Sequence, residues 1–212
     1  MFGDHLEDVR ALMEIKRYQT KFKHKERTVA EHSWFVTKIA HGLAIWEKEK
    51  FGVESVDVER VMFLAMNHDI VEVYTGDILS TTKRMSSVLA EELDVVEEKI
   101  YEKLILPKVP KSWREMYMGI HKELADRKTV NSKLVKAGDL LDRVFECMEE
   151  IRLKNTDKFE DILREDLKSL YGLKLMSVNY FLKYSIKDIG AYEYIDKEIR
   201  DKLEEMNFEE YF

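Results

Sequence analysis

The stretch VMFLAMNHDIVEV, residues 61–73, decides how we interpret the fold of this chain. It is strongly apolar and predicts a buried helix that carries a histidine beside an aspartate, His68-Asp69. An apolar interior rarely accepts an imidazole next to a carboxylate unless something compensates both groups. A bound metal ion is the most economical compensation, because it uses both groups as ligands at once.

Two further ligand-type residues lie on other apolar helices. His32 stands in VAEHSWFV, residues 29–36, and Asp139 in LVKAGDLLDRV, residues 134–144. Adjacent residues on a helix point about 100° apart, so His68 and Asp69 reach one ion only if it lies between their directions. The chain has no cysteine cluster, which argues against a structural zinc site. The sequence therefore predicts one metal site in the middle of a helical bundle.

Composition narrows the class of protein. The chain has 212 residues and a net charge of −7, which disfavours bulk nucleic-acid binding. Its single cysteine excludes an internal disulfide and fits a reducing cytoplasm. No apolar run approaches the ~18 residues of a membrane span, and the N-terminal MFGDHLEDVR lacks the apolar core of a signal peptide. We expect a cytoplasmic protein that binds neither nucleic acid nor a membrane.

Long helices dominate the expected fold, since the chain contains only 2 Pro and 8 Gly. No segment alternates apolar and polar residues convincingly, so we expect no sheet. The sequence predicts helices over residues 4–17, 28–49, 57–72, 86–106, 112–123 and 129–153, and two or three more within 159–206. The fold class that we predict is all-α, a single-domain helical bundle over residues 1–212.

Several polar residues near the predicted metal site suit phosphate-ester hydrolysis. Glu72 falls one turn after His68 on the same helical face, where a carboxylate could orient or deprotonate the attacking water. Asp77, just past the helix end, could reach the mouth of the site. Arg17, at the end of the first helix, could grip a phosphate, and Tyr18 could contact a sugar or base. Metal, activated water and cation are the parts that this reaction needs.

The same residues also have purely structural explanations. Asp139 could pair with Arg143 one turn on, and Glu72 could be a solvated face residue. Asp77 could be an ordinary turn aspartate, and Arg17 a helix-end cation. The apolar residues around Asp139 and Glu72 favour the functional interpretation of these two, and we also favour a functional role for Asp77 and Arg17.

The basic stretch at residues 21–27 and the other histidines are not expected to form a functional site. The basic stretch at residues 21–27 lacks interleaved stacking aromatics beyond Phe22, so we expect a solvated loop rather than a nucleic-acid surface. His41 lies nine residues after His32, on the opposite helical face. The remaining histidines stand in polar or loop contexts and should be solvated: His5, His24 and His121.

Three stretches resemble the HD-domain phosphohydrolases, whose signature is H…HD…D. The stretches are RTVAEHSWFV at 27–36, LAMNHDIVEVYTGD at 64–77 and LVKAGDLLDRVFECMEE at 134–150. The chain is most similar to the bacterial 5′-deoxynucleotidases, which remove phosphate from deoxyribonucleoside 5′-monophosphates. The motif-bearing part covers about residues 10–152, and residues 159–206 carry no motif. We expect that latter segment to complete the bundle and a dimer interface.

The resemblance implies a cofactor and residue roles. One divalent transition metal ion is implied, for which we favour Co or Mn over Fe, Ni, Zn or Mg. Its ligands would be His32, His68, Asp69 and Asp139. Glu72 and Asp77 would serve the attacking water or the leaving group, and Arg17 matches a family arginine near the phosphate and sugar. Because relatives form dimers, we expect a homodimer.

The chain also departs from the bacterial pattern. Tyr18 stands where those enzymes have a tryptophan that is thought to sense the missing 2′-hydroxyl, which leaves strict deoxy selectivity open. After TGD the bacterial loop contains prolines, whereas this chain reads ILSTTKR at residues 78–84. Ser80 and Lys83 in that loop are further candidates for substrate contact.

We therefore expect a metal-dependent phosphomonoesterase that converts (deoxy)ribonucleoside 5′-monophosphates to nucleoside and phosphate. The alternative on the same fold is a phosphodiesterase, nucleoside triphosphohydrolase or pyrophosphohydrolase. The alternative of another class is a non-catalytic, metal-stabilised nucleotide-binding or scaffold protein. Glu72 and Asp77 argue against this last alternative, because a purely structural site has no use for additional carboxylates that activate water.

Overall fold

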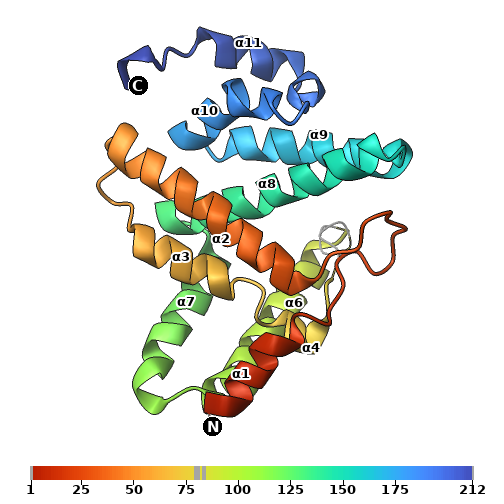
Figure 1. Ribbon diagram of the computed structural model, residues 1–212. Coiled ribbons are helices and arrows are strands. Elements are labelled where there is room, and N and C mark those ends of the chain that lie inside the picture. The colour runs from red at the N-terminus through yellow and green to blue at the C-terminus, as the bar shows by residue number, and fades with distance from the viewer. Residues whose placement is uncertain (1, 79–81, 83–84, 212) are drawn as a thin grey trace. The chain divides into compact units, whose positions relative to one another are not determined.

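Helices form nearly all of the regular structure in the computed structural model, which describes residues 2–78, 82 and 85–211 (Figure 1). Within those residues the only β pairing outside the helices is an isolated bridge between Lys16 and Thr28. The all-α prediction is confirmed. No helix of the described residues is long and apolar enough to cross a bilayer.

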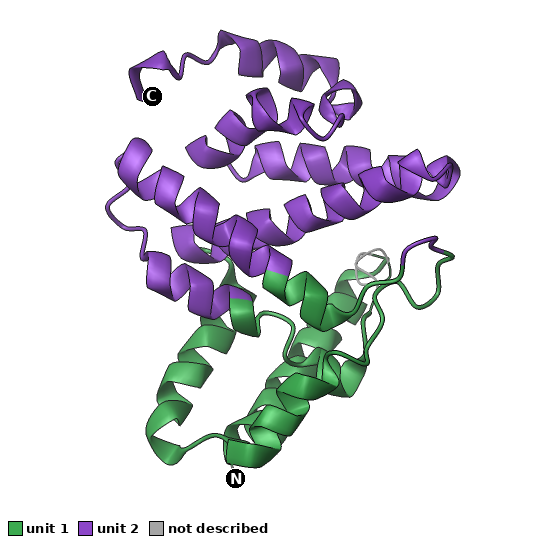
Figure 2. Ribbon diagram, in the orientation of Figure 1, with its two compact units in different colours: residues 1–22, 26–34, 66–129 green, residues 23–25, 35–65, 130–212 purple. Residues whose placement is uncertain are grey.

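The chain divides into two compact units, coloured separately in Figure 2. Unit 1 comprises residues 1–22, 26–34 and 66–129, and unit 2 comprises residues 23–25, 35–65 and 130–212. The division passes through two continuous helices, α2 (Val29–Ile45) and α3 (Val58–Asn67).

Unit 1 is built around the first part of α2 and four further helices. These are α1 (Phe2–Ala11), α4 (Glu72–Thr75), α6 (Ser87–Ile100) and α7 (Arg114–Asp126). Short turns connect the last two: η2 (Tyr101–Ile105), η3 (Leu106–Lys108) and η4 (Lys111–Trp113). Fully buried side chains of η2 and α7 form its core, among them Tyr101, Ile105 and Ile120.

Unit 2 is built on α8 (Val130–Arg152), which packs along α9 (Thr156–Gly172). Unit 2 also contains most of α2 and of α3. Its further elements are η1 (Trp46–Lys50), α10 (Met176–Lys183), η5 (Ser185–Lys187), η6 (Tyr192–Tyr194), α11 (Lys197–Glu205) and η7 (Glu209–Tyr211). Leucines of α8 and α9 are fully buried against each other, which explains why the apolar periodicity over 129–153 predicted this helix correctly.

Within unit 2, α8 approaches α2 closely at Gly138. A Cβ atom on Gly138 would lie 2.9 Å from the carbonyl oxygen of Val36 and 3.2 Å from the Cβ of Ala40. Carbon atoms do not tolerate such contacts, so a glycine is required where the two helices cross. Asp139 follows this glycine directly in the chain.

Two predicted helices end earlier than their apolar patterns suggest. α1 ends at Ala11 rather than at residue 17, because the backbone beyond it pairs with a distant segment. The amide of Arg17 donates to the carbonyl of Arg27 at 2.9 Å, and the amide of Val29 donates to the carbonyl of Ile15 at 2.9 Å. These long-range bonds replace the helical ones. The second such helix is α3, which ends at Asn67 rather than at residue 72, and this end determines the local structure of the candidate site.

Two groups that the sequence places in water are buried. The Lys23 ammonium donates to Glu146 at 2.8 Å, and the two side chains are only 4% and 1% exposed, so the prediction of a solvated basic loop is wrong at this residue. His5 is 3% exposed, and its Nε2 lies 3.3 Å from the hydroxyl of Tyr117. In both cases the partner lies more than 100 positions away in the sequence, so no local sequence pattern predicts the burial.

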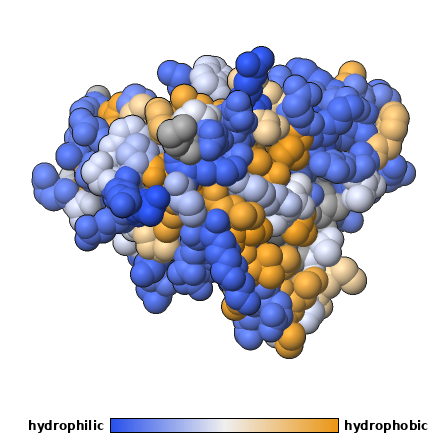
Figure 3. Space-filling view, turned by 90° about the horizontal axis from the view of Figure 1, so that it is seen from below, coloured by the Kyte–Doolittle hydropathy of each residue, from blue (hydrophilic) through white to orange (hydrophobic). Residues whose placement is uncertain are grey.

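Unit 1 also leaves apolar side chains exposed along α1 and α6. They are Phe2, Leu6 and Val9 on α1, with Met13 just beyond it, and Val88, Leu89, Val95 and Val96 on α6. Figure 3 shows apolar side chains gathered among hydrophilic ones on one face of the molecule. Gathered apolar side chains mark an interaction site more often than scattered ones do.

Candidate active site

The His68-Asp69 pair lies in a turn between α3 and α4, not inside a helix. The amide of Ile70 donates to the carbonyl of Asn67 at 3.3 Å, and that of Glu72 to the carbonyl of Asp69 at 3.0 Å. The helix predicted over 57–72 is therefore wrong at this point. The turn brings the adjacent side chains together, with His68 Nε2 3.1 Å from Asp69 Oδ2, whereas a regular helix would separate their directions by about 100°.

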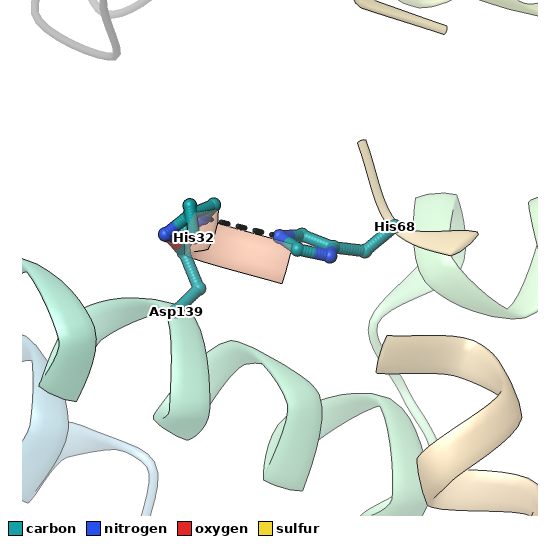
Figure 4. Close-up of side chains that lie close together, drawn as sticks. All are labelled: His32, His68 and Asp139. Carbon is teal, nitrogen blue, oxygen red and sulfur yellow. Dashed lines mark hydrogen bonds between the residues drawn. The ribbon is translucent and has the colours of Figure 1, made fainter. Parts of the chain in front are cut away.

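His32 reaches the same place from the first turn of α2. Thr28 and Glu31 form a capping box there: Glu31 accepts from the Thr28 amide at 2.7 Å, and Thr28 Oγ1 accepts from the Glu31 amide at 3.2 Å. His32 is fully buried. Its Nε2 lies 3.2 Å from His68 Nε2 (Figure 4) and 3.4 Å from Asp69 Oδ2.

These three atoms fit the donor set of a divalent transition metal. Ligand atoms about 2.1 Å from a common ion lie about 3.0–3.4 Å apart at octahedral or tetrahedral angles. The observed separations of 3.1, 3.2 and 3.4 Å match that range. Two imidazole nitrogens and a carboxylate oxygen also have the mixed chemistry that such ions accept. His32, His68 and Asp69 therefore form a suitable metal site within unit 1.

The imidazoles also set the charge state of Asp69. Burial alone would raise the pKa of its carboxyl, but the charge and hydrogen bonds of His68 and His32 outweigh burial and hold that pKa well below its usual range. The Asp69 carboxyl is therefore ionised at neutral pH, as metal binding requires.

Arg17 and Tyr18 lie beside this cluster, in a turn rather than on the predicted helix. Arg17 is 8% exposed, and its Nη1 is 4.0 Å from Asp69 Oδ2. Tyr18 is buried and has a φ of 56°, which is unusual for a residue with a Cβ atom. Asp77 supports this conformation, because its Oδ2 accepts from the Tyr18 amide at 2.5 Å. Sequence reasoning missed this contact, which joins residues 59 positions apart.

The remaining predicted site residues lie in different places. Glu72 begins α4 and is half-buried. Asp139 lies on α8 in unit 2, where its Oδ2 accepts from Lys136 Nζ at 2.6 Å. Lys136 and Asp139 are three positions apart on one helix, a spacing from which this ion pair could have been predicted. Ser80 and Lys83 lie outside the residues that the structure describes.

Comparison with known proteins places the chain in a family. Residues 4–189 match the family described as 5′-deoxynucleotidase YfbR-like. The chain belongs to this family. The 5′-deoxynucleotidase YfbR of Escherichia coli is 34% identical over 143 residues, which cover 68% of this chain and 70% of that protein.

Solved structures agree with membership of the YfbR-like family. An HD-domain phosphohydrolase from Listeria innocua has a TM-score of 0.81 and 29% identity, covering 95% of this chain and 97% of its own. The HD phosphohydrolase DatZ of cyanophage S-2L, solved with dA and one catalytic Zn2+ ion, has a TM-score of 0.53 at 12% identity, covering 94% and 96%. At that identity the likeness extends to the fold alone.

Membership confirms the main prediction made from the H…HD…D stretches. The chain is a metal-dependent phosphohydrolase of the HD-domain type, and its relatives act on nucleotides.

Proposed function

We propose that this member of the YfbR-like family is a phosphomonoesterase that hydrolyses (deoxy)ribonucleoside 5′-monophosphates to nucleoside and inorganic phosphate. The observation that carries the proposal is the cluster of His32, His68 and Asp69, with the buried guanidinium of Arg17 4.0 Å from the aspartate. A metal site with an adjacent arginine suits a small anionic substrate, even in a protein with a net charge of −7.

Asp139 is proposed as the fourth ligand of the ion. His32, His68 and Asp139 offer ligand atoms of the types that transition metals accept (Figure 4). The continuity of α2 supports this assignment, because Val36, which α8 approaches at Gly138, lies one turn after His32. We favour Co or Mn as the ion. A divalent ion at this position would polarise the phosphoryl group and lower the pKa of the attacking water.

The other residues bind and orient the reactants in this proposal. Glu72 accepts a proton from the attacking water, since it is a half-buried carboxylate whose backbone amide donates to the carbonyl of Asp69 at 3.0 Å. The Arg17 guanidinium binds phosphate oxygens. Asp77 holds the backbone of Tyr18, whose side chain contacts the sugar, and this contact decides between ribose and deoxyribose. Ser80 and Lys83 keep their proposed place in substrate binding.

Phosphate release from a nucleotide panel with added Mn2+ or Co2+ tests the function. We expect 5′-monophosphates to yield phosphate and nucleoside. Release of pyrophosphate or triphosphate from nucleoside triphosphates, or cleavage of diesters alone, would replace the proposal with one of the rival hydrolases. Metal binding without any turnover would favour a scaffold or nucleotide-binding protein.

We also propose that the protein is a cytoplasmic homodimer of single-domain chains, assembled through the exposed apolar side chains of α1 and α6. Light scattering should give a mass about twice the 25.2 kDa of one chain. Leu6→Glu combined with Val88→Glu should shift it to the monomer, because charges at an apolar interface oppose association. An unchanged mass in that variant would exclude this face.

A further inference from the structure

The short helix α4 depends on polar contacts for its position. It contains four residues, Glu72–Thr75, and none of them is buried. Isolated helices of this length are unstable in water, and helices usually gain their stability from packing an apolar face. The buried Ile70 and Val71 hold the chain just before α4, but α4 itself buries no side chain, so polar contacts contribute to its position.

A cluster of three side chains within unit 1 supplies that contact. The Tyr74 hydroxyl donates to Asp8 Oδ2 at 2.7 Å. Lys108 Nζ lies 2.8 Å from Asp8 Oδ1, 2.7 Å from Asp8 Oδ2 and 2.8 Å from the Tyr74 oxygen. An ammonium group has three protons to donate, and these three contacts can use all of them. The same nitrogen lies 5.4 Å from the centre of the Tyr74 ring.

The two partners of Tyr74 lie on elements that pack against each other. Asp8 lies on α1, and Lys108 ends η3, which packs against α1 and is flanked by the buried Ile105 and Val109. The hydrogen bonds to Asp8 and Tyr74 raise the pKa of Lys108 to about 12, so its charge persists at neutral pH.

Tyr74 and Glu72 lie on opposite sides of α4. Two residues apart on a helix correspond to about 200° of rotation, so the tyrosine anchors the side away from the carboxylate. We infer that Asp8, Tyr74 and Lys108 are positioning residues that hold α4 on α1 and η3 and thereby fix the orientation of Glu72. This inference rests on the proposed role of Glu72 in the hydrolysis.

Tyr74→Phe removes one hydroxyl and tests the inference. We expect kcat for a deoxyribonucleoside 5′-monophosphate to fall ~10- to 100-fold, because small misplacements of a reacting group cost about that much. KM and metal content should stay near those of the wild type. Amide hydrogen exchange of residues 72–76 should become faster. Lys108→Met should reproduce both the fall in kcat and the faster exchange, and it serves as the test if the Tyr74→Phe protein does not fold. Lys108→Arg, which keeps the positive charge, should retain much of the activity.

Tyr192→Phe is the matched control. Tyr192 also donates to a carboxylate, Glu204, at 2.7 Å, and a lysine, Lys187, lies 4.5 Å from the centre of its ring. It belongs to unit 2, and its loss should leave kcat unchanged. A Tyr74→Phe enzyme with wild-type kcat would overturn the inference, and so would unchanged exchange in α4. Failure of the proposed function is distinct, because the wild type itself would then release no phosphate.

Discussion

Replacing His68 with alanine should remove the bound divalent ion and lower nucleoside monophosphate turnover about a thousandfold, since the metal's polarising effect is worth several kcal/mol. The His68 nitrogen is one of three donor atoms separated by 3.1–3.4 Å, so its loss leaves two of these three beside the proposed fourth ligand, Asp139. Asp69→Asn should act similarly, because it removes the ionised ligand while keeping its shape. Metal analysis of the purified protein and phosphate release measure both effects.

Metal-dependent stabilisation gives a readout that is independent of turnover. An ion at 100 times its dissociation constant stabilises the folded wild type by about 2.7 kcal/mol, and the His68 variant should gain far less at the same concentration. His41→Ala is the control, since His41 lies on α2 nine residues after His32, on the opposite face. Retention of metal and turnover by the His68 variant would remove the basis of the proposed site.

The grouping of His32, His68 and Asp69 could be expected from the sequence, but its local geometry could not. A histidine and an aspartate inside an apolar run need partners that offset the cost of burying them, and this holds for any local backbone conformation. The run from Val61 to Val73 contains no Gly or Pro, so its pattern continues as a helix through His68-Asp69. The turn after Asn67 has no local signal. The turn brings the side chains of His68 and Asp69 together, and this could be seen only in the structure.

Contacts between distant residues account for most of the other differences. The structure confirms the starts of the helices predicted from residues 28 and 57. Contacts within three residues stabilise both starts: the capping box of Thr28 and Glu31, and the Asp57 carboxylate, which accepts from the Arg60 amide at 2.9 Å. By contrast, the hydrogen bond from the Tyr74 hydroxyl to Asp8 joins residues that are 66 positions apart in the sequence. The bond from Lys23 to Glu146 joins residues that are 123 positions apart. Such pairs depend on the packing of helices, which periodicity along a single chain does not encode.

Arg143→Met should destabilise the protein by about 3–5 kcal/mol. Arg143 on α8 holds Asp166 on α9 with two parallel hydrogen bonds, Nε to Oδ2 at 3.0 Å and Nη2 to Oδ1 at 2.5 Å. Their side chains are 7% and 1% exposed. Removal of the guanidinium leaves a carboxylate buried without its main partner. Arg143→Met with Asp166→Leu should recover most of the loss, because it removes both charges. Chemical unfolding measures each difference.

The loss caused by Arg143→Met should also depend on pH. Burial raises the pKa of Asp166, and Arg143 opposes that rise. An acid with a raised folded pKa binds more protons when folded, so stability falls as pH rises from the unfolded pKa, 3.8, to the folded one. Without Arg143 the folded pKa rises further and this range widens. The destabilisation should be smallest well below pH 3.8, where the carboxyl is protonated in both states, and full at neutral pH.

Arg164→Met separates burial from the mere loss of an arginine. Arg164 also lies on α9 and pairs with Glu160 at 2.8 Å, but the two side chains are 46% and 35% exposed. Water solvates each charge there when the other is removed, so the change should cost less than about 1 kcal/mol and vary little with pH. Equal losses at Arg143 and Arg164 would mean that burial does not set the strength of the α8–α9 pair. A large loss at Arg143 alone would show that burial makes the unpaired Asp166 carboxylate costly, and recovery in the Arg143→Met, Asp166→Leu variant would show that the pair tolerates the removal of both charges but not of one.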